Sequence, residues 1–281
     1  MKLKLTIFVL LMVIQSGALM AKEIIHWYQS DSPPFIILRG PDKGTGSIDS
    51  VIKFFQERIP QYEHKNALSN LVRFEKQAKN GENWCHAWLL KTAEREKFLF
   101  YSDPATLVLP SHLIIKKENL ALFGSQNQVS LEKIFKNKRI KGRVARSRSY
   151  GKKIDSLIER YKDVSNLKLV SQKEIQVLKM LLLDRIHYTI NYPVVADYLA
   201  HQFNAAEKFI SIPLKETQDI KKGYIGCART PWGRQVIDQI NQVLKKERTS
   251  QLYRKMVTEL WLDRNSSRIL NTHYDRIMFE N

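Results

Sequence analysis

The chain of 281 residues lacks the short motifs that mark several common classes of enzyme. Its seven histidines show no H-x-x-x-H or similar metal-binding spacing, and no G-x-S-x-G sequence is present. The glycine-rich segment at residues 40–47 lacks the Gly-Lys-Ser/Thr ending that phosphate-binding loops require. These absences lead us to expect no catalytic activity, no metal and no cofactor.

Cysteine is also scarce, and long apolar runs are confined to the N-terminus. Lys2 and Lys4 precede an apolar segment at residues 5–14, and small residues follow, which is the layout of a secretory signal peptide. The apolar segment is shorter than the roughly 20 residues that span a bilayer. We therefore expect cleavage after Ala21 or Ala18 and export from the cytoplasm, with no lipid anchor because no cysteine follows the cleavage region.

Acidic residues are few relative to basic ones. The chain has 46 lysines and arginines against 28 acidic residues, a formal charge of +18, which becomes +16 without Lys2 and Lys4. Such a charge suits nucleic acid, an anionic membrane surface or an acidic small molecule. Export and the lack of a nucleic-acid-binding motif make nucleic acid the least favoured of these partners.

The apolar patterning after the signal peptide predicts an α/β fold. Short apolar strands at residues 23–28, 62–65 and 84–90 alternate with helical patterns at 47–59 and 68–80. This βαβαβ order implies parallel strands covered by helices. A second α/β unit follows, with strands at residues 139–145, 167–170, 187–192, 209–213 and 224–228.

The helix between residues 174 and 183 has an apparent start signal. Ser171 and Glu174 have the spacing of a capping box, in which each side chain satisfies a backbone amide at the helix start. Earlier in the chain, we expect residues 98–101 to form a strand that ends in a turn at residues 102–104. The apolar segment at residues 113–115 would then enter the second unit.

The segment KTAEREKFLFYSDP at residues 91–104 resembles the T-x-x-R … F-S-x-P signature of bacterial solute-binding protein family 3. Those proteins are extracytoplasmic receptors of amino-acid-type ABC importers, and the resemblance covers nearly all of the chain after the signal peptide. It implies a two-lobed, periplasmic-binding-protein-like type II fold in which each lobe is a mostly parallel sheet flanked by helices. Residues 22–110 would form the first lobe and 111–225 the second, with 226–281 returning to the first.

The same resemblance bears on Cys85 and Cys227. Both lie in apolar, strand-like segments, and from the residues alone they could be bridged or could be two separate buried thiols. In the family topology the strand that returns from the second lobe lies beside the strand that carries Cys85. The resemblance therefore favours a disulfide.

Candidate ligand-binding residues follow the carboxyl ends of the predicted strands. Arg95 matches the family position that holds a ligand carboxylate, although it could instead be a surface arginine paired with Glu94 or Glu96. The serines and arginines of residues 146–150 precede a helix and could bind an anion, or form a solvated basic turn. Trp88 could equally be a core residue, whereas Tyr28 and Phe35 lie at turns and are favoured as pocket residues. The full set is Arg95, Tyr28, Phe35, Trp88, Thr92, Arg146, Ser147, Arg148, Ser149, Tyr150, Asn191 and Tyr192.

The resemblance implies a monomeric periplasmic binding protein that passes a small ligand to an inner-membrane permease. Many amino-acid binders carry an aspartate where this chain has Asn191 and Tyr192, so we expect an anionic or neutral ligand without a free amine, most favourably a carboxylate. Three alternatives remain open. They are a sensor of the same fold that signals to a receptor, a periplasmic lyase or dehydratase on this scaffold, and a basic protein that binds partners through its surface.

Overall fold

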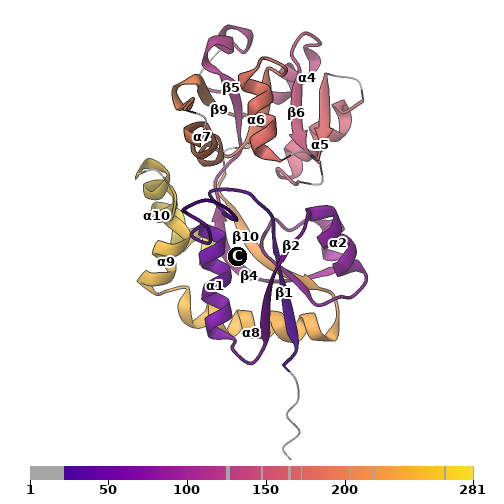
Figure 1. Cartoon of the computed structure of the whole chain (residues 1–281), viewed down its shortest axis with the longest axis vertical. Helices are drawn as coiled ribbons and strands as arrows, with labels where there is room; N and C mark the ends of the chain where they lie inside the picture. The colour runs from indigo at the N-terminus through magenta and orange to yellow at the C-terminus, as the bar shows by residue number, and fades with distance from the viewer. Residues whose placement is uncertain are drawn as a thin grey trace, which may run out of the picture.

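A computed structural model describes residues 22–124, 127–146, 148–163, 166–171, 173–202, 204–217, 219–262 and 264–280. Two mixed sheets of five strands form two lobes, one above the other in Figure 1. We call the lobe that contains β1 lobe 1 and the lobe that contains β5 lobe 2. None of the helices in the described ranges is long and apolar enough to cross a membrane.

Lobe 1 is built on the strand order β2-β1-β3-β10-β4. Strands β1, β2 and β3 run parallel, as the βαβαβ pattern predicts, whereas β10 is antiparallel to both β3 and β4. The strands are β1 (Ile24–Gln29), β2 (Glu63–Leu68), β3 (Trp84–Leu89), β4 (Leu99–Val108) and β10 (Lys221–Ala228). The helices are α1 (Ser47–Arg58), α2 (Leu71–Lys79), α3 (Ala93–Glu96), α8 (Pro231–Glu247), α9 (Gln251–Thr258) and α10 (Arg264–Phe279).

Lobe 2 repeats this plan with the order β7-β6-β8-β5-β9. Strands β6, β7 and β8 are parallel, and β5 is antiparallel to β8 and β9. The strands are β5 (His112–Lys116), β6 (Gly142–Ala145), β7 (Leu167–Val170), β8 (Tyr188–Asn191) and β9 (Phe209–Pro213). The helices are α4 (Leu131–Lys136), α5 (Lys152–Tyr161), α6 (Glu174–Leu182) and α7 (Pro193–Gln202), with 3-10 turns η1 (Lys117–Leu122) and η2 (Ala206–Lys208).

The predicted turn at residues 102–104 is wrong, because these residues lie inside β4. Pro104 has no backbone N–H to donate and usually interrupts a strand. Here β4 is the edge strand of its sheet, and its register with β10 shifts next to the pair of Tyr224 with Pro104. An edge position and an irregular register are the two settings in which a strand tolerates proline.

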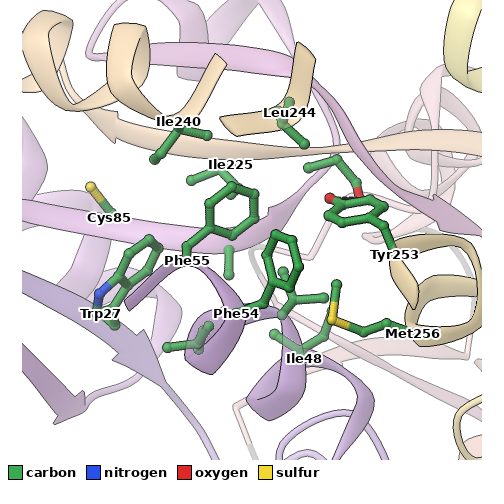
Figure 2. Close-up of a cluster of buried hydrophobic side chains, with 14 of the residues drawn as sticks. Trp27, Ile48, Phe54, Phe55, Cys85, Ile225, Ile240, Leu244, Tyr253 and Met256 are labelled. Carbon is green, nitrogen blue, oxygen red and sulfur yellow. Dashed lines mark hydrogen bonds between the residues drawn. The ribbon is translucent and has the colours of Figure 1, made fainter. Parts of the chain in front are cut away.

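The core of lobe 1 is organised around β3 and β10. Cys85 and Cys227 are paired across these strands and joined by a disulfide, which confirms the bridge that the resemblance favoured. Figure 2 shows Cys85 at one side of a cluster in which Phe55 of α1 packs beside Ile225 of β10, with Ile240 of α8 close by. Each lobe has its own hydrophobic core, and the disulfide lies within the core of lobe 1.

The long strands β4 and β10 also carry the connections between the lobes. They remain paired up to Val108 and Lys221, after which β4 leads through residues 109–111 into β5. Strand β10 follows β9, the last strand of lobe 2. The two lobes are thus joined by two adjacent segments, which we call the hinge, and Trp88 near the end of β3 contacts Tyr192 directly after β8.

Candidate functional site

Three aromatic rings connect the lobes above the hinge. The Phe35 ring, in the loop after β1, lies 4.4 Å from the Trp88 ring of β3, centroid to centroid. Tyr192, directly after β8 in lobe 2, lies 5.6 Å from each of them. We call these three residues the aromatic bridge. All three are predicted site residues, and the structure brings them together from two lobes.

Asp49 in the first turn of α1 positions the loop that carries Phe35. Its buried carboxylate accepts hydrogen bonds from the backbone amides of Ile37 at 2.8 Å and Gly46 at 3.2 Å, and from Gln29 Nε2 at 3.2 Å. Burial raises the pKa of Asp49, and these amide donors oppose the rise. Gly46 is required because an added Cβ would lie 2.3 Å from the carbonyl oxygen of Phe35.

A charged pair lies beside the aromatic bridge in lobe 2. Arg148 Nη1 donates to Glu174 Oε1 at 2.9 Å and to Asn191 Oδ1 at 3.0 Å, and its guanidinium carbon lies 4.5 Å from the centre of the Tyr192 ring. Burial raises the pKa of Glu174, and the charge of Arg148 opposes that rise. Nη2 of Arg148 and Oε2 of Glu174 are buried, and neither has a hydrogen-bond partner within the described part of the chain.

Lobe 1 contributes a second charged pair. The buried Arg95 donates through Nε to Glu75 Oε1 of α2 at 3.2 Å, so it pairs with neither Glu94 nor Glu96 in the salt bridges of the described residues. Thr92 caps α3 by accepting a hydrogen bond from the Arg95 amide at 3.2 Å. The fold thus holds the Arg95 guanidinium against a carboxylate of its own lobe.

Tyr28 of β1 and His86 of β3 form a stacked pair in lobe 1. The Tyr28 ring stacks on the His86 ring at 4.4 Å, and both residues are buried. Burial, with a smaller contribution from the charge of Arg95, lowers the pKa of His86 to about 3, so the imidazole is neutral at neutral pH. The pKa of Tyr28 is raised, first by burial and also by the charge of Glu174 in lobe 2.

Most of the predicted anion-binding turn at residues 146–150 serves the fold. The Ser149 hydroxyl donates to Asp155 Oδ2 at 2.6 Å, and the Tyr150 amide donates to Asp155 Oδ1 at 2.7 Å. Both donors are therefore already bonded to the carboxylate of Asp155 in α5. The Tyr150 hydroxyl accepts from the Ala145 amide at 2.9 Å. Arg146 is exposed and donates to the Leu169 carbonyl at 3.2 Å. Ser147 lies outside the described residues.

Comparison with known proteins identifies the fold. A scan against protein-family models finds no match, and a search of curated proteins finds none either. Solved structures match over most of their length. A histidine kinase sensor domain with similarity to periplasmic binding proteins is 14% identical, with 85% of this chain and 96% of that chain covered and a TM-score of 0.68.

The chain has the two-lobed periplasmic-binding-protein fold. Two further matches are amino-acid-binding proteins. An amino acid ABC transporter substrate-binding protein from Streptococcus pneumoniae bound to L-arginine is 14% identical, covers 88% of this chain and 96% of its own, and has a TM-score of 0.64. An ancestral amino-acid-binding protein that is a precursor of cyclohexadienyl dehydratase is 13% identical, covers 85% and 95%, and has a TM-score of 0.62.

Sequence reasoning did not select two acidic residues that this periplasmic-binding-protein fold pairs with arginines of the candidate site. Glu174 was assigned to a capping box, but the N-cap of α6 is Lys173, and no side chain caps that helix end. Glu75 lies within α2, where its pairing with Arg95 depends on tertiary packing. The available signal was an acidic residue close to a partly apolar helix face, which alone does not distinguish a site residue from a solvated one.

Proposed function

We propose that this chain is an exported, monomeric solute-binding protein that holds a small carboxylate-bearing ligand between its lobes and delivers it to an inner-membrane permease. Ligand would contact the aromatic bridge and the charged pairs of both lobes. Closure of the lobes about the hinge would then present a surface that differs from the open form, because a ligand favours the conformation that it binds more tightly.

The observation that carries this proposal is the Arg148–Glu174 pair. Two buried polar atoms, Nη2 and Oε2, lack hydrogen bonds within the described residues, and they lie beside an aromatic surface drawn from both lobes. Buried donors and acceptors are normally satisfied, and guanidinium groups bind carboxylates with two parallel hydrogen bonds. A ligand carboxylate on Arg148 therefore supplies the missing acceptor.

Glu174 also changes the expected ligand class. The sequence has no aspartate after β8, which argued against a ligand with a free amine. The structure brings a carboxylate to the same neighbourhood from α6, where Asn191 binds the same guanidinium. Ligands that carry both a carboxylate and an amine are therefore included in the proposal, with Arg148 facing the first group and Glu174 the second.

A thermal-shift screen of the purified protein tests the proposal. Amino acids, their matched 2-hydroxy acids, other organic acids and short peptides would be compared, with Arg148→Gln as the test variant and Arg146→Gln as the control from the same turn. A ligand at about a hundred times its dissociation constant adds roughly 2.7 kcal/mol of stability. We expect a carboxylate to stabilise the wild type and Arg146→Gln but not Arg148→Gln. A well-folded wild type that no compound stabilises would contradict the proposal.

A sensing role is the second candidate, because one structural match is a histidine kinase sensor domain. The two roles differ in the membrane partner that recognises the closed form. Affinity capture from solubilised inner membranes, with and without the stabilising ligand, separates them. Ligand-dependent recovery of a permease supports delivery, and recovery of a receptor kinase supports sensing.

We propose binding without catalysis, although one match is a precursor of a dehydratase. The groups that could move a proton are constrained in this chain. His86 is buried with its pKa lowered to about 3, and Glu174 is held by Arg148. Recovery of the stabilising ligand unchanged after prolonged incubation would support binding, and conversion to a product would establish an enzyme.

A further inference from the structure

A hollow lies beside the hinge, and its wall includes all three residues of the aromatic bridge. This hollow, which we call the hinge pocket, has a volume of about 740 Å³. Its wall comes from α1, α9 and α10 of lobe 1, from the start of α7 in lobe 2, and, at and next to the hinge, from residues 106–110, Asp219, Ile220 and Lys222. The charged pairs Arg95–Glu75 and Arg148–Glu174 do not contribute to its lining. Pockets of this size commonly hold small molecules.

The wall of the hinge pocket is largely apolar. Apolar side chains come from Ile48 and Val51 of α1, Met256 and Val257 of α9 and Ile269 of α10. Figure 2 shows Ile48 and Met256 next to each other at the margin of the lobe 1 core. Burying an apolar molecule against these side chains is favourable because it removes hydrocarbon surface from water.

Two buried polar atoms belong to residues of this wall and have no hydrogen-bond partner in the part of the chain that the structure describes. They are Oγ1 of Thr106, whose residue is 4% exposed, and Nδ1 of His112. Burial lowers the pKa of His112, so its ring is neutral at neutral pH and can donate or accept a hydrogen bond. Both residues belong to the segment that runs from β4 into β5 through the hinge.

The formal charges of the wall residues cancel, and both basic groups contact other residues of the wall. Lys222 Nζ donates to the carbonyl oxygen of Glu280, and Arg276 Nη2 contacts His273 Nδ1 at 3.3 Å. Acidic and basic side chains both occur in the lining, with Asp219 and Glu280 beside Lys222 and Arg276. The unsatisfied groups are thus a hydroxyl and a neutral imidazole, which match an uncharged polar head group better than an ion.

We infer that the hinge pocket is a second binding site, separate from the charged pairs, for a small uncharged amphiphile such as an aliphatic or aromatic alcohol. The apolar part of that molecule contacts α1, α9 and α10, and its hydroxyl bonds Thr106 and His112. Because Phe35, Trp88 and Tyr192 belong to its wall, the shape of the site depends on how the lobes are arranged. An occupant therefore shifts the hinge equilibrium by its difference in affinity for the open and closed forms.

Calorimetric titration of the purified protein with octanol, and with octanoate as its charged counterpart, tests this inference. Val257→Trp places a bulky ring in the pocket, and Leu252→Trp is the matched control, since Leu252 lies on the same helix and is 63% exposed. Thr106→Val removes the unsatisfied hydroxyl and little volume.

We expect octanol to bind the wild type and Leu252→Trp with similar affinity, and octanoate to bind less tightly. Val257→Trp should weaken octanol binding at least tenfold, and Thr106→Val severalfold. No binding to the wild type, or equal binding to Val257→Trp in its folded form, would overturn the site. Equal affinity of Thr106→Val for octanol would overturn the assigned head-group contact even if Val257→Trp fails to fold.

Discussion

Arg148, from the turn before α5, and Glu174, from the first turn of α6, meet at 2.9 Å in lobe 2 beside a ring surface shared with lobe 1. Both side chains are largely buried, at 18% and 23% exposure. Charges that are removed from water are retained where they are paired and hydrogen-bonded, and removing one partner leaves the other unpaired. The pair thus couples the folding of lobe 2 to the chemistry of the proposed site.

Removing either member of this pair should destabilise the protein. Removing both should lower the free energy of unfolding by less than the sum of the two single losses. We expect Glu174→Gln and Arg148→Gln each to lower the free energy of unfolding by about 1–3 kcal/mol. The double variant should recover part of that loss because no charge remains unpaired. Urea denaturation of the four proteins measures the coupling, and additive losses would show that the two side chains do not interact.

Glu75 should control how strongly Arg95 attracts an anion. Its carboxylate lies 3.2 Å from Arg95 Nε and competes with any ligand carboxylate for the guanidinium. We expect Glu75→Gln to raise the affinity for the carboxylate ligand by about threefold to tenfold. A tenfold change in affinity corresponds to about 1.4 kcal/mol of added attraction between Arg95 and the ligand. The control is Glu94→Gln, an exposed residue paired with Lys97. Unchanged or weaker binding would assign Arg95 a purely structural role.

His86 should make the fold sensitive to acid. Its pKa is lowered to about 3 in the folded protein against about 6.5 when unfolded, so between these pH values the unfolded chain alone binds the proton. The free energy of unfolding should therefore fall as pH drops below 6.5, with a contribution approaching about 1.4 kcal/mol per pH unit.

Chemical denaturation between about pH 7 and pH 5 measures this slope. We expect His86→Asn to reduce the slope, because an amide does not titrate and its oxygen can still accept the Trp88 amide hydrogen bond that His86 Nδ1 accepts at 3.1 Å. His201→Asn, at an exposed position, is the control. Equal slopes for the wild type and His86→Asn would rule out a protonation penalty at His86.

The disulfide should contribute substantially to stability. Cys85 and Cys227 are separated by 142 residues, and closing so long a loop restricts the unfolded chain. Loss of such a bridge typically costs about 2–5 kcal/mol. We expect the Cys85→Ala/Cys227→Ala double variant to lose about that much free energy of unfolding and to unfold at a lower denaturant concentration. A midpoint equal to that of the oxidised wild type would contradict the prediction.

Local periodicity was sufficient to predict the fold class. The alternation of short apolar strands with amphipathic helices predicted the parallel part of each sheet. That the strands carrying Cys85 and Cys227 are neighbours was predicted from the topology that the resemblance implied. Each sheet is nevertheless half antiparallel, because the strands that cross the hinge run against their neighbours. Such pairings join segments far apart in sequence, and periodicity contains no information about them.

The site was less predictable for the same reason. Phe35, Trp88 and Tyr192 were all selected because they follow or lie in strands, and tertiary packing brings them together. Glu174 was misassigned because its spacing from Ser171 fitted a local capping motif. Its carboxylate instead binds Arg148, which lies 26 residues earlier. A local rule that fails at a buried charge is a feature of functional sites.

The most direct test of the account is whether the lobes close on a ligand. Cysteines introduced at the exposed Arg73 of α2 and Glu159 of α5 can be spin-labelled selectively, because Cys85 and Cys227 are bonded to each other. These helices lie on the same side of the molecule in opposite lobes (Figure 1). Double electron–electron resonance would measure the distance between the labels with and without the carboxylate that stabilises the protein in the screen. The account predicts a shorter distance with ligand, and no change when Arg148 is also replaced by Gln. An identical distance distribution with saturating ligand would contradict binding between the lobes.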